Sequence, residues 1–188
     1  MSTFKWTGLV DSNWSNPGNW SPNSGVPNSS SDIAQFTGSY SVSQAAVNLD
    51  INAVIAEIDF GSSSNITISS NNASGLTLTA SSGSSIISLG SKAAANSGTD
   101  TFAVPVTVTG TPMAATLSGG ALVVSGAGSI QGSPAVSFKV MTGGALTVDD
   151  SVGSPNNNRI KDTASLTLAG GAFNYVGNSA NSTETIGA

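Results

Sequence analysis

Two acidic side chains in this 188-residue sequence have the spacing that catalytic carboxylates need. Glu57 and Asp59 stand two apart in the apolar run Val54–Phe60, so in a strand both point to one face. Carboxylates about 5–9.5 Å apart can hydrolyse glycosides, and carboxylate oxygens also bind calcium. The simpler interpretation is preferred: two solvated acids on the wet face of an amphipathic strand, with Ile58 and Phe60 inward.

A second set of acidic residues could form a carboxylate row along a stack of coils. Its members, with one neighbouring arginine, are Asp50, Asp100, Asp149, Asp150, Asp162 and Arg159. A calcium-binding row needs several converging oxygen donors, as in nonapeptide repeats of the form Gly-Gly-x-Gly-x-Asp. That pattern is absent from the sequence. We therefore interpret these aspartates as turn formers and assign no metal ligand.

All three tryptophans, Trp6, Trp14 and Trp20, lie at the start of the chain. An exposed indole offers a flat apolar surface on which a sugar ring can stack, so these residues are candidate carbohydrate-binding residues. This hypothesis predicts that Trp14 and Trp20 are solvent-exposed and coplanar. The alternative, which we prefer, is that the three rings seal the first coil of the fold.

The chain contains no His and no Cys, which removes several kinds of chemistry. A Ser-His-Asp triad, a Cys-His dyad, a zinc site of the usual ligands and a structural disulfide cannot form. Five basic residues are too few for a nucleic-acid surface, and their scatter argues against a polysaccharide lyase or hydrolase. We expect no enzymatic activity and no cofactor.

Charged residues make up only 8% of the sequence, against about 25% in typical proteins. Ser, Thr, Asn and Gly must cover the surface instead, as in secreted bacterial β-proteins. Apolar residues recur at strand period, which argues against a disordered chain. No apolar run approaches the ~20 residues of a membrane span, and Met1–Trp6 does not begin a signal peptide. We expect an extracellular, cell-surface protein whose signal peptide precedes this sequence.

The elements that must position these residues are short strands that repeat. The phrase Gly-Gly-Ala-Leu occurs at 119–122 and 143–146, and a looser copy spans 164–171. Its leucines, Leu122, Leu146 and Leu166, are 24 and then 20 residues apart, and we expect them to stack as the structural core of successive coils. A sandwich or barrel is the alternative, but its tight Asn-Gly and Asp-Gly hairpin turns are missing. The sequence predicts an all-β solenoid.

We expect an irregular, aromatic-rich cap over residues 1–40 and one continuous solenoid of six or seven coils over 41–188. In the cap, short strands are predicted near Phe4–Leu9 and Ile33–Phe36. In the solenoid, the apolar runs that predict strands are Tyr40–Val42, Val47–Ile51, Val54–Phe60, Ile66–Ile68, Leu76–Leu78, Ile86–Leu89, Phe102–Val108, Leu122–Val124, Val136–Val140, Leu146–Val148, Leu166–Leu168 and Phe173–Val176.

Motifs of a known kind stand at both ends of the chain. The start contains Trp6-Thr-Gly, Trp14, Asn19-Trp20, Pro27 and Asp32–Phe36, and the close contains Leu166–Asn178 and Ser182–Ala188. Both resemble bacterial proteins that carry autotransporter-associated β-strand repeats. The resemblance implies a right-handed parallel β-helix that is exported and forms the passenger or stalk of a large surface protein, with no catalytic site.

The close of the chain departs from that family. There the phrase Thr-Ile-Gly-Ala is normally followed by another Leu-Thr-Leu strand, whereas this sequence stops at Ala188. We see no polar C-terminal cap, although a solenoid needs one to protect its last edge. We expect either a fragment that continues in further solenoid repeats or an end that docks on another copy.

These observations predict a non-catalytic structural protein of the bacterial surface: a stalk, an adhesin or a filament-forming segment. Its expected partners are other copies joined end to end, further solenoid repeats, or a cell-surface glycan. The alternative is a carbohydrate-binding module that uses the N-terminal tryptophans.

Overall fold

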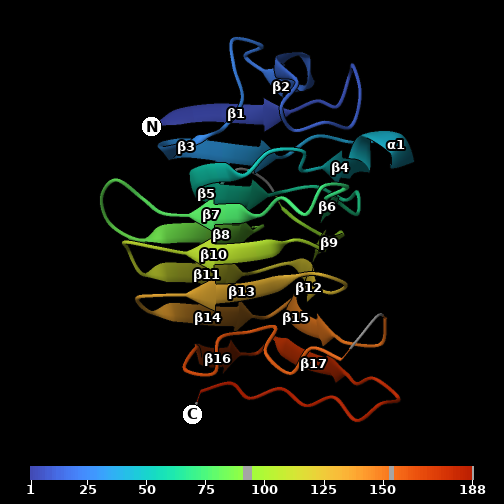
Figure 1. Cartoon of the computed structure of the whole chain (residues 1–188), viewed down its shortest axis with the longest axis vertical. Coiled ribbons are helices and arrows are strands. Elements are labelled where there is room, and N and C mark those ends of the chain that lie inside the picture. Colours follow the sequence, from blue (N-terminus) through green and yellow to red (C-terminus); the bar gives the residue numbers. More distant parts are fainter. Residues whose placement is uncertain (91–94, 153–154, 188) are drawn as a thin grey trace.

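A computed structural model of the chain describes residues 1–90, 95–152 and 155–187. Almost all of its regular structure is β, and parallel strands stack as a solenoid of about six turns. The N-terminus lies near one end of the stack and the C-terminus at the other (Figure 1). The expected parallel β-helix is confirmed.

Three strand-bearing faces run along the solenoid, and face A is a sheet of its own. Its strands in spatial order are β4 (Ala46–Asn48), β6 (Thr67–Ser69), β9 (Thr99–Phe102), β12 (Gly120–Val124), β15 (Gly144–Asp149) and β17 (Ala172–Val176). All of these neighbours pair in parallel.

Faces B and C belong to a second sheet, which divides at the long strand β5 (Ala53–Phe60). The first half of β5 pairs with face B and its second half with face C. Face B continues through β7 (Leu76–Leu78), β10 (Pro105–Val108) and β13 (Ser129–Gly132). Face C continues through β8 (Ser85–Leu89), β11 (Met113–Leu117), β14 (Val136–Met141) and β16 (Ser165–Ala169).

The N-terminal elements close the first coil. Strand β3 (Ser29–Phe36) pairs in parallel with β5, and β1 (Ser2–Trp6) pairs in parallel with β3. Strand β2 (Trp20–Ser21), which follows a turn of 3₁₀ helix (Pro17–Asn19), lies antiparallel across the end of β1. Residues 1–40 are therefore not separate from the ladder, since β1 and β3 already belong to face C.

Strict alternation puts every second residue into a core that runs the length of the solenoid. One inward row on face C is formed by residues that pair in register from strand to strand: Phe36, Phe60, Leu89, Leu117, Val140 and Leu168. All of them except Leu168, on the last strand, are buried. The solenoid is held together by such stacked apolar rows and by the ladder hydrogen bonds between coils.

The expected leucine stack is correct for two of its three members. Leu122 and Leu146 pair in register on face A and are fully buried. Leu166 was wrongly placed with them: it pairs with Phe138 on face C, and Leu146 pairs with Phe173 instead. The repeated Gly-Gly-Ala-Leu phrase alternates apolar and polar residues, as strands on all three faces do. Its recurrence therefore does not indicate on which face a copy lies.

Some strand predictions also need correction. Strands β11 and β13 were missed because Ala, Ser and Gln dilute their apolar pattern. The run Phe102–Val108 is divided, since a corner separates the end of β9 from the start of β10. Tyr40–Val42 forms no strand: Ser41 and Gln44 form a capping box that begins the one-turn helix α1 (Val42–Ala45).

Candidate functional site

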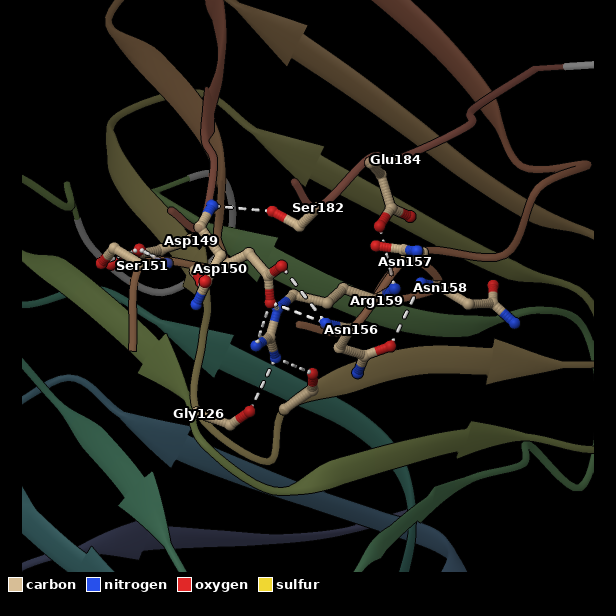
Figure 2. A network of polar contacts seen from close by, with 12 residues as sticks. Gly126, Asp149, Asp150, Ser151, Asn156, Asn157, Asn158, Arg159, Ser182 and Glu184 are labelled. Carbon is tan, nitrogen blue, oxygen red and sulfur yellow. Dashed lines mark hydrogen bonds and ion pairs between the residues drawn. The ribbon is translucent and has the colours of Figure 1, made fainter. Parts of the chain in front are cut away.

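The most connected polar site is a buried ion pair at the C-terminal end (Figure 2). Arg159 and Asp150 are both fully buried, and the guanidinium Nη2 lies 2.8 Å from Oδ1 of Asp150. Nε donates to the same oxygen at 3.1 Å, and Nη1 donates to the carbonyls of Gly126 and Gly128 at 2.8 and 2.9 Å. One guanidinium thus ties the 150s segment to the corner between β12 and β13.

The carboxylate of Asp150 is held ionised by this arrangement. Burial raises its pKa, but hydrogen bonds from Ser182, the Asn156 backbone and Arg159, together with the arginine charge, lower it below its ordinary value overall. The Asn156 N–H lies 3.0 and 3.2 Å from the two carboxylate oxygens. The Asp150 carboxylate therefore uses its hydrogen bonds to hold neighbouring segments of the chain together.

Glu184 extends this network onto the backbone. Its two carboxylate oxygens accept from the N–H groups of Arg159 and Ile160 at 3.0 and 2.8 Å. Ile160 bridges to Ile130 of β13 and so continues face B. The carboxylate thus accepts the backbone hydrogen bonds that carbonyl groups of a further strand would otherwise accept. Burial raises the pKa of Glu184. The expectation of no polar C-terminal cap is wrong for face B.

The N-terminal end is closed by the tryptophans. Trp6, Trp14 and Trp20 are 0%, 0% and 1% exposed. Their indole N–H groups donate to backbone carbonyls of Gln44, Pro27 and Trp14 at 2.8, 3.0 and 2.9 Å. The preferred interpretation, that the three rings seal the first coil, agrees with the burial of all three side chains.

The tryptophan geometry contradicts the carbohydrate hypothesis. Trp14 and Trp20 meet edge to face, with ring centroids 4.8 Å apart and planes 70° apart, and Trp6 meets Trp20 in the same way at 4.9 Å. Neither solvent exposure nor coplanarity is present, so Trp6, Trp14 and Trp20 offer no platform to a sugar. The rings pack against each other rather than face solvent, because apolar rings at the end of a coil are more stable when buried.

Glu57 and Asp59 are not the solvated pair that the sequence suggested. They lie on one side of β5, with Ile58 and Phe60 in the core as predicted, but their side chains are only 4% and 1% exposed. The Gln35 amide donates to Asp59 at 3.3 Å. Both residues pair with neighbouring strands, Glu57 with Ile33 and Ile86 and Asp59 with Gln35 and Ser88.

The other aspartates do not form a carboxylate row. Asp149 accepts from the backbone and hydroxyl of Ser151, which is the expected turn chemistry. Asp50 binds Ser15 in the N-terminal segment, and Asp162 is exposed. Among the described residues no group of three or more acidic side chains could hold a metal ion.

Asp100 interrupts an apolar row. It pairs with Leu122 in the inward row that continues to Leu146 and Phe173, and it is fully buried. Its oxygens accept from the Ile66 N–H at 3.2 Å and from the Asn96 side-chain amide at 2.9 Å. Burial raises its pKa to about 7, against the lowering effect of these two hydrogen bonds.

Sequence reasoning missed the structural roles of Arg159 and Glu184. The only arginine of the sequence, which stands near Asp149, Asp150 and Asp162, was the one available signal, because a buried arginine is rarely without a charged partner. Nothing in the local pattern indicated that Glu184 would accept backbone hydrogen bonds from residues about 25 positions earlier.

No family model, curated protein or solved structure matches this chain. The fold defines the class of protein, which is a parallel β-helix. No helix among the described residues is long and apolar enough to cross a membrane.

Proposed function

We propose that this protein is a non-catalytic structural module, a stalk segment that spaces and presents other parts of a bacterial surface protein. One observation carries the proposal. The inward row of face C runs without a gap from Phe36, beside the N-terminal seal, to Leu168 on the last strand of that face. A side chain in such a row contacts both neighbouring coils, so tension on one coil is shared with the next.

The candidate groups for chemistry support the same proposal. Arg159, Asp150 and Glu184 bind one another or the backbone, and the indoles fill the end of the core. These side chains hold corners and ends of the solenoid in place, which is what a spacer requires.

The extracellular, cell-surface location is part of the proposal. A surface of Ser, Thr, Asn and Gly with 8% charged residues and the resemblance to autotransporter-associated repeats both favour it. Antibodies against the solenoid should label intact cells of the source bacterium. Label that appears only after lysis would contradict this location.

Single-molecule force measurement tests the mechanical role. The chain is held at Ser2 and Gly187 and pulled along the solenoid axis. We expect a series of force peaks, each releasing one coil of roughly 20–30 residues, because each coil is held by its own ladder. Extension at low force without peaks would contradict the stalk role.

A further inference from the structure

A chain of three polar residues joins two successive coils at the corner that leads into face A. Asn96 stands in its middle: the amide Nδ2 donates to Oδ2 of Asp100 at 2.9 Å, and Oδ1 accepts from the Ser62 backbone N–H at 3.0 Å. The other oxygen of Asp100 accepts from the Ile66 N–H at 3.2 Å. Asp100, Asn96 and Ser62 are 0%, 6% and 3% exposed, so the hydrogen bonds within this corner decide the state of each group.

The side-chain amide of Asn96 is held in one orientation. A backbone N–H can only donate, so the Ser62 N–H requires the amide oxygen on its side. The amide nitrogen then faces Asp100, and it also lies 3.5 Å from the Gly119 carbonyl, a further acceptor. The space around the amide is narrow, because a Cβ at Gly120 would lie 2.6 Å from Nδ2 of Asn96. Asn96 therefore presents a donor to the carboxyl group.

The two protonation states of Asp100 differ in which group lacks a partner. As a carboxylate it accepts at both oxygens, but the charge is buried and no cation among the described residues contacts it. As a neutral acid it carries an O–H that must donate. Both groups that face it, the Ile66 N–H and the Asn96 amide nitrogen, are donors themselves. Burial raises the pKa of Asp100 to about 7, so both states are populated near neutral pH.

No other charge among the described residues changes at this corner near neutral pH. The segments packed against Asp100 are the corner before β6, strand β12 and residues 95–98, and none of them carries a charged side chain. Tyr40 is the titratable group coupled to Asp100, and it stays protonated because burial raises its pKa. The proton on Asp100 therefore decides the charge of this corner.

We propose that Asp100, Asn96 and Ser62 form a proton-operated switch in the wall of the solenoid. When Asp100 takes up a proton from solvent, its O–H donates to Asn96, whose amide turns over to offer its oxygen. The amide nitrogen then faces the Ser62 N–H, which loses its acceptor. When the proton leaves, the amide turns back and the hydrogen bond from Ser62 forms again. The inference does not depend on the stalk role, since it concerns one corner of the fold.

Ser62 connects this switch to the corners on either side. Its hydroxyl donates to the Gly38 carbonyl at 2.6 Å and accepts from the Ser64 N–H at 2.9 Å. Its carbonyl accepts from the N–H groups of Ser97 and Gly98 at 3.2 and 3.1 Å. Three successive corners thus meet at this residue, and loss of the bond from its N–H should loosen the wall between them.

NMR spectroscopy of the full chain between pH 4 and 9 tests the proposal. The carboxyl carbon of Asp100 reports its protonation, while the Ser62 backbone amide and the Asn96 side-chain amide report the turn of Asn96. We expect all three signals to change with one shared midpoint. The Ser62 amide proton should move upfield on acidification, because it loses its hydrogen bond. This comparison needs only the wild-type protein, so it stands even if a variant misfolds.

Asp100→Asn removes the titrating group, so the Ser62 amide signal should then stay constant between pH 4 and 9. Asp149→Asn is the matched control, because Asp149 accepts from Ser151 in a turn of another coil, and it should leave the Ser62 titration as in wild type. A Ser62 amide that stays constant while the Asp100 carboxyl carbon titrates would overturn the proposal. An Asp100 carboxyl that does not titrate between pH 4 and 9 would overturn it as well.

Discussion

At the scale of single residues, Asp100 is the side chain whose placement has the largest pH consequence. It is the one carboxyl in an inward row that is otherwise apolar from Leu122 to Phe173. The ordinary pKa of 3.8 applies when the chain is unfolded, and burial raises the folded value to about 7. The folded protein therefore holds a proton that the unfolded chain releases between these two pH values.

The predicted effect is a loss of stability as the pH rises. The contribution of Asp100 is fully present below pH 3.8 and is lost as the pH approaches 7. The free energy of unfolding should fall by up to roughly 4 kcal/mol over this range. Tyr40, the titratable neighbour that is coupled to Asp100, stays protonated here because burial raises its pKa further.

Urea denaturation at pH 4 to 8 measures this effect, with Asp100→Asn as the comparison. The variant keeps an acceptor for the Ile66 N–H but cannot titrate, so the difference in unfolding free energy between wild type and variant should change with pH. A constant difference across the range would show that Asp100 titrates normally.

Arg159 gives a second prediction at this scale. Arg159→Ala removes the guanidinium charge that pairs with the buried Asp150 carboxylate, and the donor to the carbonyls of Gly126 and Gly128. Breaking a buried pair in this way costs about 3–5 kcal/mol. Lys161→Ala is the control, since its ammonium donates to the Pro134 carbonyl at an exposed site, and this change should cost less than about 1 kcal/mol. Equal losses in thermal denaturation would refute the structural role of the ion pair.

At the scale of elements, the aromatic seal is predicted to contribute strongly to stability. Trp14→Ala removes a fully buried ring that packs on Trp20 and Phe36, and it should cost about 3–5 kcal/mol. Leu9→Ala, at an exposed position of the same segment, should change stability by less than about 0.5 kcal/mol. Added polysaccharide should leave tryptophan fluorescence unchanged, because the rings are inaccessible.

The position of a coil along the stack decides how much its core residues matter. Leu146→Asp puts a charge into a fully buried place between two coils and should cost more than about 4 kcal/mol. Leu166 is only partly buried against the core, so Leu166→Asp should cost markedly less. Thr147→Ala, on the outer side of the same strand as Leu146, is the control. Similar losses for the two leucine variants would contradict this difference in burial between Leu146 and Leu166.

At the scale of the whole molecule, the sequence was sufficient for the class of fold but not for its details. Alternating runs such as Leu76–Leu78 and the repeated Gly-Gly-Ala-Leu phrase predicted stacked parallel strands, because alternation is a local property. The assignment of Leu166 to a face depends on how many residues the corner before it takes up, and corner length has no local signature.

The polar contacts show the same limit. The turn role of Asp149 was predictable, since its partner Ser151 is two residues away. Three other contacts form between residues that meet only after the coils have stacked. They are the Gln35 contact with buried Asp59, the ion pair of Arg159 and the contacts of Glu184 with the backbone. Short-range chemistry can be predicted from the sequence, whereas these contacts require the register between coils.

The central claim is that the described chain is one continuous parallel ladder whose core is closed at the N-terminal end by the buried tryptophans. Residue-resolved hydrogen exchange tests it most directly. We predict slow exchange from β3 through β14, protection that persists at the amides of Trp6 and Trp14, and fast exchange confined to the outer edges of β16 and β17. Equally fast exchange at both ends would contradict the account, because it would mean that the buried tryptophans do not close the first coil.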